Sequence, residues 1–508
     1  MINPQFKHTP LAMALVAAAT SLSTQAATSV DTYTLREAVT LDGVRSHQAA
    51  FQAAADANGG TREASSPGYQ ASVDYVVEQM TAAGYEVTIQ DFNYPFFEEN
   101  VAATLEQLAP TPTVYEYFGQ MGFATMTYSG SGDVKAIAEG VDLALPPAPE
   151  PNTSTSGCEA TDFSGFTAGN IAILQRGSCS FSVKAQNAAD AGASGVVIFN
   201  EGQPGRTENF LGTLGEPGIS VPVVGAAFDV GVELAAGGVE ARLVVDANSE
   251  IRTTANVIAN SPEGRDDRVV VVGAHLDSVA EGPGIQDNGS GSAAILETAI
   301  QMANQQITPR NQVRFAWWGA EEAGLLGAQH YVDNLSAREI KDIALNLNFD
   351  MIGSPNFVRF VYDGDGSDTP VAGPNGSKTI ESVFLEYFEA VSLPVEPTAF
   401  DGRSDYGPFI EVGIPAGGLF TGAEGIKTPD EAALYGGTAG EPYDPCYHLA
   451  CDTFDNISLQ ALGEMSDAVA HSVLTFAMTT SAVNGTDKGK GLGKIKNDME
   501  YRGSRLVK

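Results

Sequence analysis

The stretch RVVVVGAHLDSVAEGPGIQDN (residues 268–288) combines an apolar run with residue types that bind metals. His275 and Asp277 are two positions apart, a spacing that suits a metal ligand and the carboxylate that orients it, and Asp287 follows on a glycine-rich loop. The valines at 269–272 show no polar alternation, which is typical of a strand buried on both faces of a mostly parallel sheet. We therefore predict a metal site at the end of a central strand.

Two later segments also end in carboxylates. The apolar residues 313–318 lead through Gly319 to Glu321 and Glu322, and residues 345–349 end at Asp350. Open α/β sheets gather their ligand sites at the carboxyl ends of the strands. An isolated HxD pair has only about one chance in ten of binding metal, and a lone loop carboxylate is usually solvated. The prediction of a metal site rests on the convergence of all these side chains from three strands.

The surrounding pattern supplies the elements that would position these strands. Helical periodicity occurs at 46–57 and 69–84, and residues 85–92 alternate as in a strand. A further helix with one apolar stripe is expected at 290–304, between two of the predicted strands. Alternating strands and helices predict an α/β fold with a largely parallel sheet.

Length and charge limit the possible functions. A chain of 508 residues is too long for one ordinary domain, so two or three domains are expected. Its 63 acidic residues outnumber 27 basic ones, which gives a formal net charge of −36. Nucleic acid and anionic membranes would be repelled, so neither is expected as a partner.

The N-terminus and the cysteines indicate export. Basic residues precede an apolar core at 11–19 and small residues surround Ala26, so residues 1–26 are expected to be a cleaved signal peptide. No other stretch approaches the roughly 20 apolar residues of a membrane span, so we expect a soluble secreted or periplasmic protein. Export permits disulfides, and we favour the local pairs Cys158–Cys179 and Cys446–Cys451 over free thiols by roughly four to one.

A second module begins near residue 110, where Gly, Ser, Thr and Pro become frequent. Short strands are expected at 171–174 and 195–199, on either side of a helix at 182–191. The segment at 169–200, followed by ISVPVVG, resembles the protease-associated (PA) domain. The resemblance covers residues 111–246, which contain no metal-ligand spacing, so a role as lid, spacer or substrate guide is expected.

The rest of the chain resembles the secreted bacterial dizinc aminopeptidases that are similar to leucyl aminopeptidase. The shared motifs are GAHLDS (273–278), GIQDNGSG (284–291), WGAEEAGLLGA (318–328), NFDMIGSPN (348–356), DGRSDYGPF (401–409), GGLFTGA (417–423) and CYHLACDT (446–453). The resemblance implies a three-layer αβα zinc exopeptidase sheet with an inserted, mainly β PA domain. The peptidase domain would comprise 27–110 and 247–484, and a disordered basic tail would follow at 485–508.

The resemblance also implies a ligand set for two Zn²⁺ ions. Asp287 would bridge them, His275 and Asp350 would complete one site, and Glu322 and His448 would complete the other. These nitrogen and oxygen donors are of the type that zinc accepts. The remaining positions would be open to water and substrate.

The adjacent catalytic roles follow from the same resemblance. Asp277 would orient His275, Glu321 would be the general base, and the hydroxyl of Tyr447 would help to bind the oxyanion. In general a tyrosine beside a ligand histidine more often packs than catalyses, but the CYH context favours catalysis here. The two adjacent glutamates are thus expected to differ in role.

Two further assignments have alternatives. Arg403 resembles the family position that contacts substrate near its amino end, and a salt bridge to Asp401 or Asp405 is about equally expected. The Cys446–Cys451 bridge would close a small loop and make its ligand histidine rigid, whereas the competing interpretation is zinc-thiolate binding.

These features predict an aminopeptidase that acts on peptides with a free N-terminus and works as a monomer. Glu321 and Asp350 could pair with the substrate ammonium, and an apolar pocket at 417–426 would favour leucine-like residues.

Two rival functions remain. A zinc carboxypeptidase of the same broader family would use the same ligands with a cationic pocket, but few basic residues lie near the motifs. A non-catalytic receptor-like binding protein would not need a complete set of ligands, base and oxyanion tyrosine.

Overall fold

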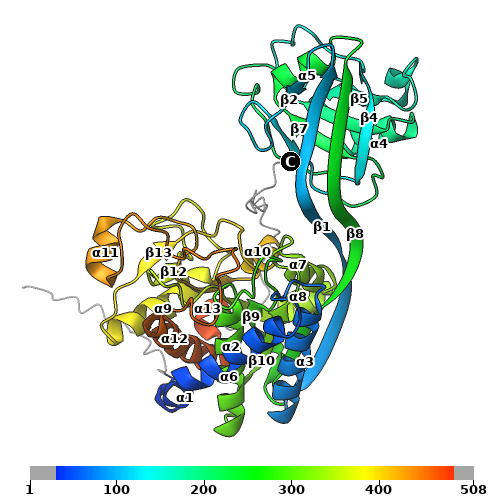
Figure 1. The fold of residues 1–508 in the computed structure, drawn as a ribbon. Coiled ribbons are helices and arrows are strands. Elements are labelled where there is room, and N and C mark those ends of the chain that lie inside the picture. Colours follow the sequence, from blue (N-terminus) through cyan, green and yellow to red (C-terminus); the bar gives the residue numbers. More distant parts are fainter. Residues whose placement is uncertain (1–29, 485–508) are drawn as a thin grey trace, which may run out of the picture.

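A computed structural model describes residues 30–484, which form two parts joined by a ribbon of two long strands (Figure 1). The strands β1 (Glu86–Ala109) and β8 (Glu240–Asn260) run antiparallel along almost their whole length. The lower part contains both ends of the described chain, and the upper part is built from the residues between the two strands. The expected signal peptide and basic tail lie outside the described residues.

The lower part is built on a mixed sheet whose centre is parallel. The strand order is β13 (Glu396–Thr398), β12 (Phe360–Tyr362), β14 (Ala416–Phe420), β11 (Ile343–Phe349), β9 (Arg265–His275), β10 (Asn311–Trp318) and then β8. Strands β14, β11, β9 and β10 are mutually parallel, whereas β12 and β8 flank them as antiparallel neighbours. The carboxyl ends of β9, β10 and β11 therefore meet at one edge of the sheet.

Helices cover both faces of this sheet. One face packs against α1 (Tyr33–Ala38), α2 (Leu41–Asp56), α3 (Pro67–Ala82), α6 (Gly289–Asn304), α9 (Ser377–Ala390), α12 (Leu459–Met478) and α13 (Ser481–Asn484). The other face packs against α7 (Leu326–Asp333), α8 (Ala337–Asp342) and α10 (Tyr406–Glu411). Val270 and Val272 lie in the first core, whereas Val269 and Val271 lie in the second. This two-sided burial explains the unbroken valine run and confirms the three-layer α/β prediction.

In the upper part the sheet continues from β8, in the order β4 (Gly132–Gly140), β5 (Ile171–Gln175), β6 (Gly195–Phe199), β7 (Val223–Ala226) and β3 (Phe123–Thr125). Its other elements are β2 (Thr113–Val114), the 3₁₀-helix η1 (Ala160–Phe163), α4 (Phe181–Asp190) and α5 (Phe228–Leu234). Two apolar clusters fill the space on either side of the sheet, and the Cys158–Cys179 disulfide links its loops. This part therefore has a hydrophobic core separate from that of the lower part.

The ribbon is the main difference from the predicted elements. The sequence predicts a strand only at 85–92, but β1 continues past Pro95. Proline cannot donate a hydrogen bond to a sheet, so it normally ends a central strand. Around Pro95, β1 pairs only with β8, and its contact with β2 comes later, at Glu106 and Gln107; an edge of this kind tolerates proline.

No helix among residues 30–484 is both long and apolar enough to cross a membrane.

The remaining helix, α11 (Pro429–Tyr435), lies in the lower part. It begins with a capping box, in which the side chains of Thr428 and Glu431 each accept from the backbone amide of the other residue.

Candidate metal and catalytic site

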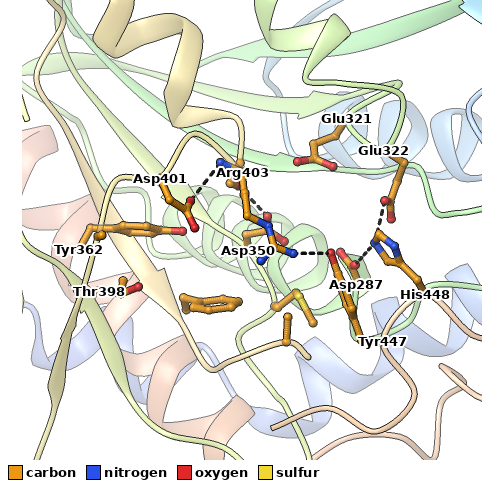
Figure 2. Close-up of a pocket in the computed structure, with 15 residues that line it drawn as sticks. Asp287, Glu321, Glu322, Asp350, Tyr362, Thr398, Asp401, Arg403, Tyr447 and His448 are labelled. Carbon is orange, nitrogen blue, oxygen red and sulfur yellow. Dashed lines mark hydrogen bonds and ion pairs between the residues drawn. The ribbon is translucent and has the colours of Figure 1, made fainter. Parts of the chain in front are cut away.

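Three strand ends and one disulfide-closed loop bring the predicted site residues together (Figure 2). His275 is the last residue of β9, and Asp287 lies in the loop that leads to α6. The segment after β10 supplies Glu321 and Glu322, and Asp350 directly follows β11. His448 comes from the loop closed by the Cys446–Cys451 disulfide. Side chains that are up to 173 residues apart in the sequence thus meet at one edge of the sheet.

A glycine permits the close approach of two ligand-bearing segments. A Cβ atom on Gly291 would lie only 2.1 Å from the carbonyl oxygen of Phe349, so the first turn of α6 can lie against the end of β11 only without a side chain. Asn288 caps this helix by accepting from the amide of Gly291 at 2.9 Å, and its Nδ2 donates to the Phe349 carbonyl at 2.9 Å. These contacts fix Asp287 next to Asp350.

The donor atoms form two sets that share Asp287. The Nε2 atom of His275 lies 3.1 Å from Oδ1 of Asp287 and 3.3 Å from Oδ1 of Asp350. The Nε2 atom of His448 lies 3.3 Å from Oδ2 of Asp287 and 3.0 Å from Oε2 of Glu322. Ligands at about 2.0–2.1 Å from a tetrahedral zinc are about 3.3 Å apart, so each set has the spacing and chemistry that zinc requires.

Glu321 lies slightly outside these sets. Its Oε2 is 4.0 Å from Nε2 of His275, farther than any of the four distances within the sets. Two groupings whose ligand atoms all lie within 4.8 Å of one another join His275 to Glu321 and Asp350, and to Asp287 and Glu322. The shorter distances favour Asp287 as the common partner of His275 and Asp350. Glu321 therefore lies next to the candidate metal ligands but does not belong to either donor set.

The site concentrates buried negative charge. Burial raises the pKa of Glu321 well above its usual range and that of Glu322 to about 7, although the neighbouring histidines oppose both shifts. Burial alone would lower the pKa of His448, but Glu322 and Asp287 raise it to about 11. Since four carboxylates lie within 4.0 Å of one or the other of two histidines, the site favours the binding of cations.

Asp277 contacts the two glutamates more directly than it contacts His275. Its Oδ1 and Oδ2 accept from the backbone amides of Glu321 and Glu322 at 3.2 and 3.3 Å. The Nδ1 atom of His275 lies 3.2 Å from the carbonyl oxygen of Asp277 but 3.6 Å from its carboxylate. The tautomer of His275 is thus set by a main-chain carbonyl, and the carboxylate holds the loop that carries the two glutamates.

Several positioning residues were missed because their partners are distant in the sequence. Asp452 accepts from the backbone amides of Gln286 and Asp287 at 2.8 and 2.9 Å. Asn456 donates to Asp452 at 3.2 Å and to Asp444 at 3.0 Å, which ties the disulfide-closed loop to the loop of Asp287. The only sequence signal was the position of Asp452 directly after Cys451 in the CYHLACDT motif.

Two other side chains support the ligand loops: Arg62, which lies outside every shared motif, and Ser404, which lies within DGRSDYGPF but was assigned no role. The buried guanidinium of Arg62 donates to the carbonyls of Leu276, Pro283 and Gly284, in the loop between His275 and Asp287. Ser404 donates to Oδ2 of Asp350 at 2.6 Å. Ligands held from outside in this way keep their orientation without a metal.

A pocket opens beside the donor atoms. It is lined by Asp287, Glu321, Glu322, Asp350, Met351, Tyr362, Thr398, Ala399, Asp401, Arg403, Ser404, Phe420, Ala423, Tyr447 and His448 (Figure 2). Of the apolar segment expected at 417–426, Phe420 and Ala423 line the pocket, whereas Ile426 is 56% exposed and does not. Met351 and Tyr362 supply apolar surface that the sequence did not predict.

Arg403 pairs with a residue that the sequence did not indicate. Its guanidinium contacts Glu424 at 2.8 and 3.2 Å and the hydroxyl of Tyr447 at 3.2 Å. The expected salt bridge to Asp401 or Asp405 is not formed, because only the backbone amide of Arg403 reaches the Asp401 carboxylate. The side chain instead extends along the pocket wall toward Tyr447.

Comparison with known proteins agrees with this geometry. A family model for peptidase family M28 matches residues 256–473, and a PA domain model matches 141–234. An aminopeptidase of Pseudomonas aeruginosa is 49% identical over 435 residues, which are 85% of this chain and 80% of the relative. Leucine aminopeptidase 2 of Trichophyton equinum is 48% identical over 326 residues, 63% of this chain and 65% of the relative.

Solved structures extend the similarity to the fold. An aminopeptidase from Aneurinibacillus sp. strain AM-1 has a TM-score of 0.61 and 26% identity, covering 93% of this chain and all of its own. BSAP, a zinc aminopeptidase from Bacillus subtilis, has a TM-score of 0.54 and 25% identity, covering 85% and 94%. The protein therefore belongs to peptidase family M28, among its aminopeptidases, and carries a PA domain.

Proposed function

We propose that the mature protein is an exported aminopeptidase that holds two zinc ions and removes apolar, leucine-like residues from the N-termini of peptides. The observation that carries the proposal is the pair of donor sets with 3.0–3.3 Å spacings, which share Asp287 through its two oxygens. His275 and Asp350 would complete one zinc site, and Glu322 and His448 the other. The zinc and leucine aminopeptidases among the similar proteins support this assignment.

The side chains around the pocket have distinct proposed roles in peptide hydrolysis. Bound zinc ions would supply Lewis acidity, which lowers the pKa of water and polarises the scissile carbonyl. Glu321, outside the donor sets and with its pKa raised by burial, would accept a proton from water and pass it to the leaving amine. Tyr447 would donate a hydrogen bond from its hydroxyl to the oxygen of the scissile carbonyl as negative charge develops there.

Recognition of a free N-terminus follows from the acidic end of the pocket. Glu321 and Asp350 would pair with the substrate ammonium, which an internal peptide bond lacks. Met351 and Phe420 would contact the first side chain, which favours apolar residues. Arg403 would lie beside the bound substrate. The charge of Arg403 is already neutralised by Glu424, so Arg403 is poorly suited to bind the C-terminal carboxylate that a carboxypeptidase recognises.

We also propose the domain organisation and location of the mature protein. Residues 27–110 and 247–484 would form the peptidase domain, residues 111–246 the PA domain, and residues 485–508 a basic tail, after removal of a signal peptide at 1–26. The PA domain would act as a lid or substrate guide, since the ribbon carries it above the peptidase part (Figure 1). Two disulfides are typical of a protein that works outside the cytoplasm, and a monomer is expected.

A cleavage assay with three substrates tests the proposed function. Leucyl amide should be cleaved, whereas its N-acetylated form and an amine-blocked dipeptide with a free carboxylate should not, because acetylation removes the ammonium charge. Elemental analysis should find about two zinc ions per chain. Cleavage of the blocked dipeptide would support a carboxypeptidase instead, and failure of zinc-loaded protein to cleave any substrate would favour a binding role.

A further inference from the structure

A chain of three side chains leads from the protein surface to the pocket. Glu424 follows the pocket residue Ala423, and its two carboxylate oxygens accept from both terminal nitrogens of Arg403, at 2.8 and 3.2 Å. The same Nη2 atom of Arg403 lies 3.2 Å from the hydroxyl oxygen of Tyr447 (Figure 2). A bidentate pair of this kind fixes the plane of the guanidinium as well as its position.

The chemistry of the guanidinium determines the direction of the hydrogen bond to Tyr447. Arginine has five N–H donors and no acceptor, so the hydroxyl oxygen of Tyr447 must accept in this contact. The phenol proton is therefore free to point elsewhere, and Tyr447 lines the pocket beside Asp287 and His448. Accepting a hydrogen bond from a cation also polarises the O–H bond, which makes Tyr447 a stronger donor.

Tyr447 cannot easily be oriented by other groups around it. Its ring stacks on His448 with centroids 3.8 Å apart, which fixes the ring plane but not the direction of the O–H bond. The carboxylates of Asp287, Glu321 and Glu322 act on the phenol electrostatically, and their negative charge would draw its proton away from a substrate oxygen. Arg403 is thus the cation that acts against these acceptors at the phenol oxygen.

We propose that Glu424 is a positioning residue for the aminopeptidase reaction: it holds Arg403 so that Tyr447 accepts from the guanidinium and keeps its own proton for the substrate oxygen. The inference rests on the proposed role of Tyr447. An ordinary ion pair with side chains 33% and 55% exposed would contribute little to stability. The ion pair between Glu424 and Arg403 instead serves to orient the hydroxyl of Tyr447.

A double-mutant cycle tests the proposal with leucyl amide hydrolysis by the zinc-loaded full chain. E424A should lower kcat about tenfold with little change in KM, since the affected hydrogen bond forms only as charge develops on the substrate oxygen. E424Q, which keeps one acceptor oxygen, should lose less. Y447F should lower kcat by roughly 10²–10³, the typical effect of removing an oxyanion donor. Adding E424A to Y447F should then change kcat less than about twofold, because the group that Glu424 orients is already gone.

Controls separate this effect from damage to the fold or the metal site. E441Q removes the same charge from an exposed residue in the segment that follows α11 and should leave kcat and KM unchanged. All variants should retain the zinc content of the wild type. The proposal is overturned if E424A lowers kcat equally in the wild-type and Y447F backgrounds, or if it raises only KM. A wild type without zinc or activity would instead overturn the proposed function, and a Y447F variant with full activity would overturn only the proposed role of Tyr447; either result would overturn this inference.

Discussion

Replacing Asp452 with alanine should weaken the binding of both zinc ions together. The side chain is only 2% exposed, and its two oxygens accept from the consecutive backbone amides of Gln286 and Asp287 at 2.8 and 2.9 Å. These bonds fix the backbone of the residue that we propose as the shared ligand. Without them, the Asp287 carboxylate would lose its orientation toward His275 and His448 at the same time.

The expected size of the effect follows from the two lost hydrogen bonds. A buried hydrogen bond contributes roughly 0.5–1.5 kcal/mol, so two contribute about 1–3 kcal/mol. Since a tenfold change in affinity corresponds to about 1.4 kcal/mol, the loss in zinc affinity should be about 10- to 100-fold. The same range is typical when an outer partner of a metal ligand is removed.

Competition with a zinc chelator measures this loss directly. The chelator concentration that removes half of the zinc should fall by about 10- to 100-fold in D452A, with both ions released over the same range. D455A, which changes an exposed aspartate three positions further along the chain, should behave as the wild type. Wild-type zinc retention by folded D452A, or release of only one ion, would refute the reasoning.

Three other outcomes are expected. Glu321→Ala should keep its zinc while kcat falls by roughly 10²–10⁴, whereas Glu322→Ala should lose metal; equal metal loss in both variants would contradict their separate roles. Opening the loop with C446S/C451S should lower zinc affinity, and wild-type affinity in this variant, measured with the same chelator, would show that the disulfide does not position His448. Burial lowers the pKa of His471 from 6.5 to about 4, so the unfolded chain binds a proton that the folded chain does not, and stability should decline as the pH falls from about 6.5 to 4. The variant His471→Phe should show a smaller decline in Tm over that window, and an unchanged decline would exclude His471 as its source.

The sequence predicted the parts of the site that carry local patterns. The valine run before His275 and the apolar segments before Glu321 and Asp350 identify buried strands whose carboxyl ends must meet in a parallel sheet. This reasoning brings the side chains to one edge without knowledge of the fold. His448 follows no such strand, and only the family resemblance of its motif placed it in the site.

The contacts that orient the site could not be predicted, because they join residues far apart and follow no periodicity. Asp452 lies 165 positions from Asp287, and Arg62 lies more than 200 positions from the carbonyls that it binds. Arg403 had two nearer carboxylate candidates in the sequence, yet the backbone directs its side chain to Glu424. Which side chains pair depends on the path of the backbone through each loop, and that path cannot be predicted from residue spacing alone.

Because the antiparallel ribbon is its connection to the peptidase part, the PA domain is an insertion that can be replaced as a unit. Phe97 and Ser249 are direct partners across β1 and β8, so the chain leaves the peptidase part and returns to it at adjacent points. A turn of about two residues could close the hairpin there without changing the strands below. Because the two parts have separate hydrophobic cores, each can accumulate substitutions with little effect on the packing of the other. Insertion, loss or replacement of the upper part during evolution would therefore preserve the geometry at the sheet edge.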